Sequence, residues 1–366
     1  MQKVLYLLNH AGKAGTERYV YTLIEKLNNK KIKAYFAYNE NGLLVERLKN
    51  NGIETFQINM SSPLDIKAAF NLSSLCKKLD IDLIHTQFLR ENYIAILSKL
   101  FNPQVKVMYT NHFVMRNDGL QKIFNRILTP FDSNIIAVCN KGKEVLISNG
   151  NKASRISVIF NGVDTSYWKE PLESTLRKEF SIGEDEIVLL CASRFAHDKG
   201  HKYLVNSIDL LKKMTNIKFK CVLAGDGPLL DDVKKQTAEL GLQKDIIFTG
   251  FRSDMKNIFM GSDLYINSSE HEALSFLIIE ALASGLPVIA TDMGGNSDII
   301  NSRTNCGLLV EYNNPESMAK GIFKLMEDDK KFAQFKLNAF KAVDDIFNLD
   351  KVVEKTYNLY VKSVEK

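Results

Sequence analysis

Short runs of Val, Ile, Leu and Phe alternate with helical patterns along this 366-residue chain, in two successive blocks. The predicted strands of the first block are 4–8, 34–38, 83–85, 105–110 and 135–138. Those of the second block are 187–192, 219–224, 246–249, 264–266 and 288–291. Continuous apolar runs are typical of parallel strands that helices cover on both faces. The pattern therefore predicts an α/β protein with two doubly wound domains.

Turn residues in the stretch 158–164 follow a strand and mark the expected domain boundary. We predict one domain over 1–166 and a second over 167–348, since 366 residues suffice for two cores. The final amphipathic helix, 349–366, is expected to pack back on the first domain. Doubly wound sheets bind ligands beyond the carboxyl ends of their strands, so we expect a site in a cleft between the domains.

Composition and cysteine usage narrow the class of protein. The chain is 45% apolar and 25% charged, which is typical of a soluble globular protein, and it contains no run of eighteen uncharged apolar residues. Its five cysteines are widely spaced and odd in number, which argues against disulfides and against a metal cluster. We therefore expect a cytoplasmic protein.

Charge is divided unevenly along the chain. Residues 1–165 contain 22 Lys and Arg against 13 Asp and Glu, whereas the remainder contains 26 against 30. A basic first domain is compatible with an anionic lipid surface or a phosphorylated acceptor, and equally with an ordinary solvated surface. Interleaved aromatic residues of the kind that bind single strands are not evident, so no nucleic-acid partner is expected.

Two glutamates, Glu272 and Glu280, flank a predicted helix start. A loop ends near Leu274 and the helix begins at about Ser275, so the amides around Phe276 face whatever precedes the helix and could bind a diphosphate. Glu280 could accept both hydroxyls of a ribose, and Glu272 could reach a group beyond the diphosphate. The alternative is an amphipathic helix with a solvated glutamate.

Two cations follow the strand 187–192, namely Arg194 and, five residues later, Lys199. At that spacing both could converge on the phosphates of a departing nucleotide. Together with the glutamate pair, this arrangement resembles the family 4 glycosyltransferases of the GT-B fold, in which two Rossmann-like domains face a central cleft. The resemblance runs from the first strand to the last helix. It implies that Arg194, Lys199 and Glu272 act in catalysis and that neither a metal nor another cofactor is needed.

Further stretches resemble the same family in order and position. Gly225 lies in a Gly-x-Gly-Pro turn, and the stretch 291–295 resembles the family's paired-glycine strand end. The resemblance places Gly225 at the donor, and Phe251 and Arg252 at the nucleotide base through backbone groups. Each glycine alone could equally serve only to turn the chain.

The loop after the first strand, 11–18, resembles the family's glycine-rich loop. The resemblance places Gly15 against the donor diphosphate, and Gly12 and Thr16 on the acceptor side. This chain has Gly15-Thr16 where the family usually has two adjacent glycines. A Gly-x-Gly-x-x-Gly dinucleotide fingerprint is absent.

His112 ends an apolar strand in Thr110-Asn-His112, which resembles the family's Thr-x-His. The resemblance gives His112 a positioning or proton-handling role near the acceptor. The alternative is a structural histidine at a strand end. His85 is interpreted as structural or supporting, because Gln87 stands where many relatives have a second histidine.

An apolar stripe recurs at helical spacing between residues 120 and 131, and Lys122 and Arg126 lie between its members. Its apolar residues are Leu120, Ile123, Phe124, Ile127, Leu128 and Phe131. Such a stripe is usually part of a core, and that is the interpretation we favour. The alternative is peripheral docking on the anionic inner leaflet of a membrane.

These features predict a metal-independent, retaining glycosyltransferase that moves a hexose or N-acetylhexosamine from a nucleoside-diphosphate sugar, UDP-linked by preference, to a saccharide or lipid-linked acceptor. Retention rests on the resemblance alone. A bacterial role in cell-surface polysaccharide or glycolipid assembly is expected. Two alternatives stay open: a sugar epimerase or phosphorylase of the same fold, and a catalytically silent nucleotide-sugar-binding protein.

Overall fold

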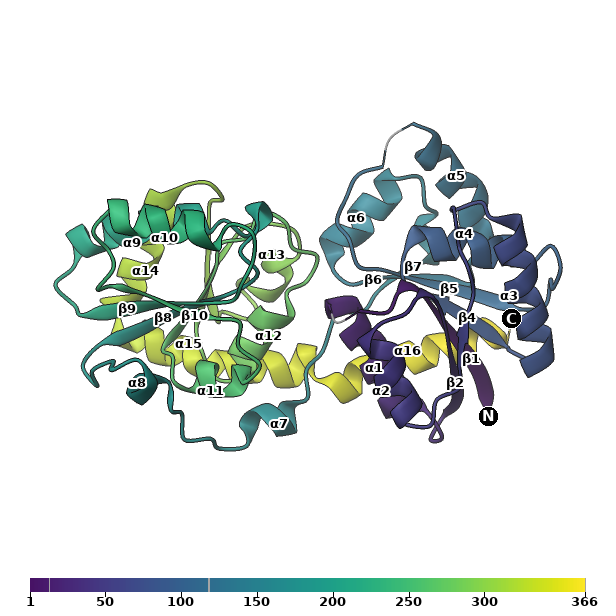
Figure 1. Cartoon of the computed structure of the whole chain (residues 1–366), viewed down its shortest axis with the longest axis horizontal. Coiled ribbons are helices and arrows are strands. Elements are labelled where there is room, and N and C mark those ends of the chain that lie inside the picture. Colours follow the sequence, from purple (N-terminus) through teal and green to yellow (C-terminus); the bar gives the residue numbers. More distant parts are fainter. Residues whose placement is uncertain (13, 118, 366) are drawn as a thin grey trace. The chain divides into compact units, whose positions relative to one another are not determined.

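The computed structural model describes residues 1–12, 14–117 and 119–365, which form two compact units. Unit 1 comprises Met1–Asn161 with Asp350–Lys366, and unit 2 comprises Gly162–Leu349. The sequence places the boundary at 166, a few residues beyond the observed one. The last helix belongs to unit 1 and lies against its sheet (Figure 1).

Unit 1 contains a seven-stranded, wholly parallel sheet in the order β3-β2-β1-β4-β5-β6-β7. Its strands are β1 (Gln2–His10), β2 (Ile32–Glu40), β3 (Thr55–Gln57), β4 (Leu83–Thr86), β5 (Lys106–Asn111), β6 (Asn134–Ala137) and β7 (Ile156–Val158). Its α-helices are α1 (Gly15–Leu27), α2 (Leu43–Asn50), α3 (Ile66–Leu79), α4 (Leu89–Ser98), α5 (Leu120–Leu128), α6 (Asn140–Ser148) and α16 (Leu349–Val364). Helices α1, α2 and α16 cover one face, and α3 to α6 cover the other (Figure 1).

Unit 2 contains a six-stranded parallel sheet in the order β10-β9-β8-β11-β12-β13. Its strands are β8 (Ile187–Ala192), β9 (Phe219–Ala224), β10 (Ile246–Gly250), β11 (Leu264–Asn267), β12 (Val288–Thr291) and β13 (Gly307–Val310). Its α-helices are α7 (Thr165–Lys169), α8 (Leu176–Glu179), α9 (His201–Met214), α10 (Leu230–Glu239), α11 (Met255–Met260), α12 (Phe276–Ala283), α13 (Asn296–Ile299), α14 (Pro315–Met326) and α15 (Asp329–Ala342).

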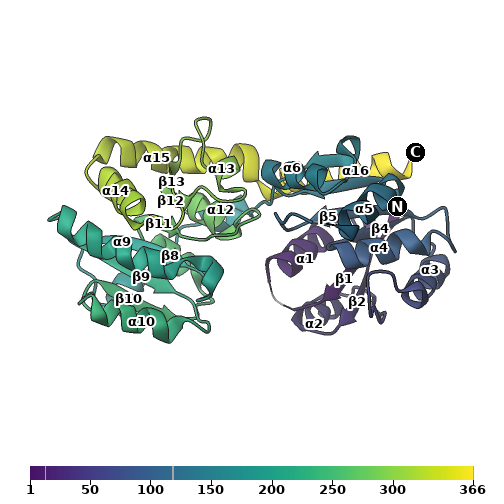
Figure 2. The ribbon, with the colours of Figure 1, turned by 90° about the horizontal axis from the view of Figure 1, so that it is seen from above.

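Each sheet is buried between helices, as its apolar strands require. In unit 2 the buried side chains of β8, β9 and β11 pack against those of α9 and α14 on one face. Figure 2 shows the strand order of this sheet from above, with α10 beside β10 at one edge. All five cysteines are buried and free of disulfides. The predicted pair of parallel-sheet α/β domains is confirmed.

His85 connects the last helix to the sheet of unit 1. Its Nδ1 lies 2.7 Å from the Tyr360 hydroxyl of α16, and its Nε2 lies 2.7 Å from Thr110 Oγ1. Tyr360 donates in turn to the Tyr6 hydroxyl of β1 at 3.1 Å. Burial lowers the pKa of His85 to about 3, so the ring is neutral in this network. These contacts explain why α16 packs on unit 1.

Candidate functional site

The strand order of unit 2 creates a switch point between β8 and β11. After β8 the chain adds β9 and β10 on one side, and then returns to place β11 on the other. Loops that follow the two central strands diverge at such a point, where doubly wound sheets bind ligands. The loop after β8 carries Arg194 and Lys199, and the loop after β11 carries Glu272.

Lys199 and Glu272 meet across this switch point. Lys199 Nζ donates to Glu272 Oε1 at 2.9 Å, and the side chains retain only 19% and 15% of their exposure. Asn267 Nδ2, at the end of β11, lies 3.5 Å from the same carboxylate oxygen. The pair places a cation and an acceptor side by side, within reach of one small ligand.

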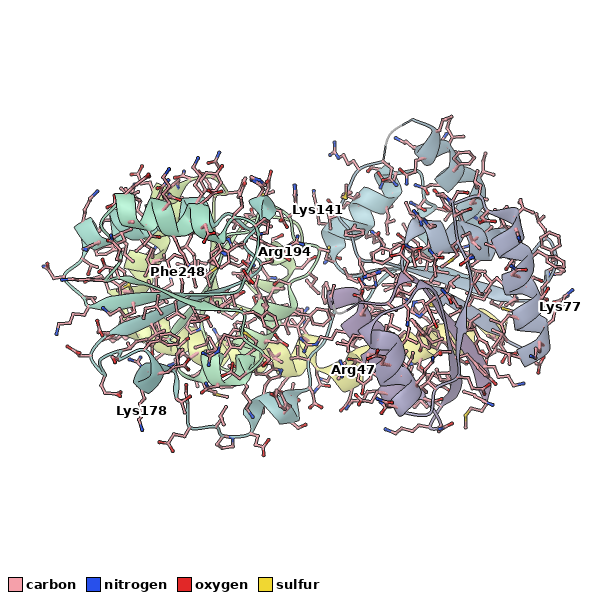
Figure 3. The ribbon with its side chains drawn as sticks, in the orientation of Figure 1. Arg47, Lys77, Lys141, Lys178, Arg194 and Phe248 are labelled. Carbon is pink, nitrogen blue, oxygen red and sulfur yellow. The ribbon has the colours of Figure 1, made fainter. Side chains whose placement is uncertain are left out.

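Arg194 projects from the loop after β8 with 70% of its side chain exposed. Figure 3 shows it at the end of unit 2 where the strands finish. Its nearest acidic partner is Asp198, at 3.9 Å, which is the outer limit of an ion pair. The guanidinium is therefore largely available to an anion that reaches this loop.

Helix α12 begins beside Glu272. Ser275 is its N-cap, and the Ser275 hydroxyl accepts from the Ile278 amide at 3.4 Å. The neighbouring Leu274 is buried, as is Glu280, which retains 3% of its exposure in the second turn of the helix. The predicted helix start is thus observed within one residue, and the buried carboxylate lies behind it.

Two glycines let the loops of the site approach closely. A Cβ on Gly200 would lie 2.1 Å from the Ser268 carbonyl oxygen, and one on Gly294 would lie 1.5 Å from the Glu272 carbonyl oxygen. Both glycines also have positive φ, +67° and +57°. Gly294 thereby fixes the backbone of the residue that pairs with Lys199.

Gly294→Ala is expected to raise the donor KM roughly tenfold, because the added methyl must displace the loop that carries Glu272. Steady-state kinetics against donor concentration measure this. Gly241→Ala is the matched control, since Gly241 also has a positive φ, +67° against +57° for Gly294, with no atom within 4 Å of its would-be Cβ. Equal donor KM values in the two variants would show that the loop position does not matter.

The predicted base-side residues lie after β10. Gly225 donates its amide to the Gly250 carbonyl at 2.8 Å, which ties the loop after β9 to this strand end. Phe251 is exposed. The Arg252 guanidinium binds Glu179 and Asp254 at 2.5 and 2.7 Å, so its side chain orders the loop. That Arg252 holds a base through its backbone stays a prediction.

In unit 1 the switch point lies between β1 and β4, and the predicted acceptor-side residues gather there. The buried Glu17 carboxylate accepts from the amides of Gly12 and Ala14, at 3.1 and 3.0 Å. Gly15 and Thr16 form the first turn of α1 rather than a loop. Lys13 lies outside the described residues.

His112 follows β5 at the same edge of the sheet. Its Nε2 lies 3.0 Å from Gln87 Oε1, and its ring packs edge-on against Tyr19 at 5.0 Å. Burial lowers the pKa of His112 to about 3. The ring is therefore neutral, with Nε2–H donating to Gln87 and the Nδ1 lone pair left as an acceptor.

Several supporting residues escaped the sequence analysis. Tyr265 is fully buried on β11 and donates to the Ala192 carbonyl at 3.2 Å. Burial, with the charges of Cys191 and of both predicted glutamates, raises its pKa well above the usual value, so the phenol stays neutral beneath the site. Asn267 could have been identified from the sequence, because it is a polar residue at the end of a buried apolar strand.

The described ranges contain no group of three or more His, Cys, Asp or Glu side chains placed to hold a metal ion. Profile comparison matches Glycosyl transferases group 1 over residues 173–342 and Glycosyltransferase Family 4 over residues 14–167. The two matched regions together span most of both units. They contain all of the predicted site residues except Gly12.

Curated relatives and solved structures agree with these profiles. The UDP-Gal:alpha-D-GlcNAc-diphosphoundecaprenol alpha-1,3-galactosyltransferase of Escherichia coli is 25% identical, over 96% of this chain and 94% of its own length. An N-acetylgalactosaminyltransferase of Campylobacter jejuni that acts on a diphospho-undecaprenol acceptor is 25% identical, over 90% and 92%. The structure of Anabaena HepE in complex with UDP superposes with a TM-score of 0.85 at 20% identity, covering 98% and 99%.

Proposed function

The chain belongs to the family 4 glycosyltransferases, and we propose that it is a retaining, metal-independent hexosyltransferase that uses a UDP-sugar. The observation that carries this proposal is the meeting of Lys199 and Glu272 beside the start of α12, at the switch point of unit 2. The diphosphate would lie against Lys199, Arg194 and the first amides of α12. Glu280 would hold the ribose, and Glu272 the sugar hydroxyls.

In the proposed reaction the bond between the anomeric carbon and the diphosphate oxygen breaks, and an acceptor hydroxyl bonds to that carbon on the same face. The departing diphosphate takes the hydroxyl proton. Lys199 and Arg194 would stabilise its growing negative charge, which such sites do most effectively with preorganised groups. A retained anomeric configuration in the product, measured by NMR, tests this course. An inverted one would contradict it.

The acceptor is proposed to be a saccharide or lipid-linked saccharide, by analogy with the relatives from Escherichia coli and Campylobacter jejuni. Its hydroxyl would approach His112 in unit 1. A thermal-shift series with nucleotide-sugars tests the donor, because a ligand that binds only the folded state raises the melting temperature. UDP-sugars should raise it most. Transfer should persist in a chelator, and loss of transfer that added metal restores would contradict metal independence.

His112→Ala is expected to lower kcat about 10- to 100-fold while UDP affinity stays unchanged, because His112 lies on the acceptor side. Since the pKa of His112 is about 3, the wild-type rate should show no inflection from this ring between pH 5 and 8. Steady-state kinetics and UDP titration measure these effects. An unchanged kcat in His112→Ala would leave the residue a structural role only.

Helix α5 turns most of its apolar residues outward, so the core interpretation is wrong for most of this stripe. Leu128 is the exception, since it packs against the core of unit 1. Leu120, Ile123, Ile127 and Phe131 retain between 53% and 72% of their exposure. The inward side of the helix also contains a polar residue: Asn125 is buried, accepts from the Tyr93 hydroxyl at 2.5 Å and donates to the Asn149 carbonyl. No helix within the described ranges is both long and apolar enough to cross a bilayer.

We therefore propose that α5 docks on an anionic bilayer, with Lys122 and Arg126 near the headgroups. Replacing Ile123 and Ile127 by Ser should abolish most co-sedimentation with phosphatidylglycerol vesicles, and wild type should bind phosphatidylcholine vesicles weakly. Leu337→Ser, at an equally exposed apolar residue of unit 2, is the control. Undiminished vesicle binding by the double variant would refute this docking surface.

A further inference from the structure

A cavity of about 400 Å³ opens in unit 1 at the amino ends of the strands. Lys106 begins β5, Asn134 begins β6, and Arg155 directly precedes β7, so all three lie at this edge. Helix α16 contributes Lys362 to the lining. His112 follows the opposite, carboxyl end of β5, so the cavity is separate from the proposed acceptor side.

The cavity concentrates positive charge. Its lining contains four cations, Lys99, Lys106, Arg155 and Lys362, and a single acidic residue, Asp132. Lys99, Lys106 and Arg155 are half-buried, which makes their charge costly to leave uncompensated. None of the four makes an ion pair with any described residue.

Two of the cations are held by backbone carbonyl oxygens and not by carboxylates. Lys99 Nζ donates to the Val105 carbonyl at 2.7 Å, and Arg155 donates to the Ser133 carbonyl at 3.4 Å. Burial lowers the pKa of Lys99, the neighbouring charge of Lys106 lowers it further, and the charge of Asp132 opposes this shift. Backbone carbonyls fix these side chains in place, but they do not neutralise them.

Asp132 does not supply the missing negative charge. Its side chain is buried, its Oδ2 accepts from Asn92 at 3.3 Å, and its Oδ1 has no partner among the described residues. Burial raises the pKa of this carboxyl well above its usual range. One carboxyl cannot balance four cations in any case, so the lining keeps a net positive charge that favours an anion.

We propose that this cavity binds a phosphate group, held by Lys106, Arg155 and Lys362. Arginine and lysine are the side chains that bind phosphate oxygens, and the volume has room for a group esterified to the phosphate. The cavity wall also contains Phe131, an exposed residue in the turn that directly follows α5. The phosphate can accordingly belong to a soluble ester or to a lipid headgroup.

Inorganic phosphate and glycerol phosphate, titrated against the full chain at constant ionic strength, test the soluble source. Each should raise the melting temperature saturably, whereas chloride should not. Replacing Lys106 and Arg155 by Gln should abolish this response and leave the response to UDP intact. The control replaces Lys30 and Lys49 by Gln, which removes the same charge from exposed lysines of unit 1.

Phosphatidylglycerol vesicles test the lipid source. If a lipid headgroup occupies the cavity, the Lys106 and Arg155 double variant should bind these vesicles at least fivefold more weakly than the control variant. In that case the melting temperature of wild type should not respond to soluble phosphate. Either outcome supports a phosphate site. The proposal is overturned if wild type responds to neither probe, or if the double variant responds as the control does. Because UDP binding is measured in parallel, this failure is distinct from failure of the proposed transferase site.

Discussion

Replacing Lys199 by alanine is expected to reduce kcat by roughly 10²- to 10³-fold, the loss seen when one preorganised group that faces developing charge is removed. Lys199 is held by Glu272 at 2.9 Å in a half-buried loop, so its ammonium is already placed before the diphosphate departs. Arg194→Ala should also slow transfer, by less, because that side chain is exposed and must be ordered by the ligand. UDP affinity should change far less than kcat in both variants.

Lys202→Ala is the matched control, since Lys202 lies exposed on α9 and its replacement removes the same charge. Single-turnover measurements with saturating donor separate the chemical step from donor binding. Lys199→Arg should rescue little, because a planar guanidinium cannot take the place of a compact ammonium within this pair. Full kcat in both Lys199→Ala and Arg194→Ala would remove the basis for charge stabilisation by these cations.

Glu280→Gln should weaken UDP binding by about 100-fold, which is about 2.7 kcal/mol. A buried carboxylate that accepts two hydroxyls makes charge-assisted hydrogen bonds, and an amide of the same size replaces them poorly. Isothermal titration with UDP measures the loss. Glu239→Gln, at an exposed position of α10, serves as the control.

The ligand can be changed as well as the protein. If Glu280 holds the ribose diol, 2′-deoxy-UDP should bind wild type much more weakly than UDP, yet bind Glu280→Gln with nearly the affinity of UDP. Such a cycle isolates the contact between one carboxylate and one hydroxyl. Equal losses from the missing hydroxyl in wild type and variant would place Glu280 away from the ribose.

The fold was readable because buried parallel strands are nearly pure apolar runs. The predicted bounds of β8, β9 and β12 are those observed. Two short edge strands, β3 and β13, were not predicted, and β7 was expected only as a strand without bounds before the turn at 158–164. An edge strand of three or four residues has little apolar pattern to recognise. Hydrophobic periodicity also does not predict which strands are neighbours. The pairing of β8 with β11 is seen only in the assembled sheet.

The site was predictable where chemistry dictates a residue type, and not where geometry does. Residue type and spacing singled out Glu272, and the resemblance to the glycosyltransferase family singled out Lys199; the structure brings the two into contact. The role of Gly294 depends on a carbonyl brought close by the fold, which the sequence cannot display. The orientation of helix α5 was predicted wrongly for a related reason. A stripe of apolar residues does not reveal whether it faces the core or the solvent, and the buried residue Asn125 makes inward contacts through polar partners.

The most direct test of the central claim is a crystal structure of the chain with a bound UDP-sugar. The diphosphate should lie at the switch point between β8 and β11, with its oxygens within hydrogen-bonding distance of Lys199 Nζ and of the first amides of α12. The ribose hydroxyls should contact Glu280. A nucleotide bound elsewhere, or a diphosphate held by a metal ion with Lys199 and Arg194 turned away, would contradict the account.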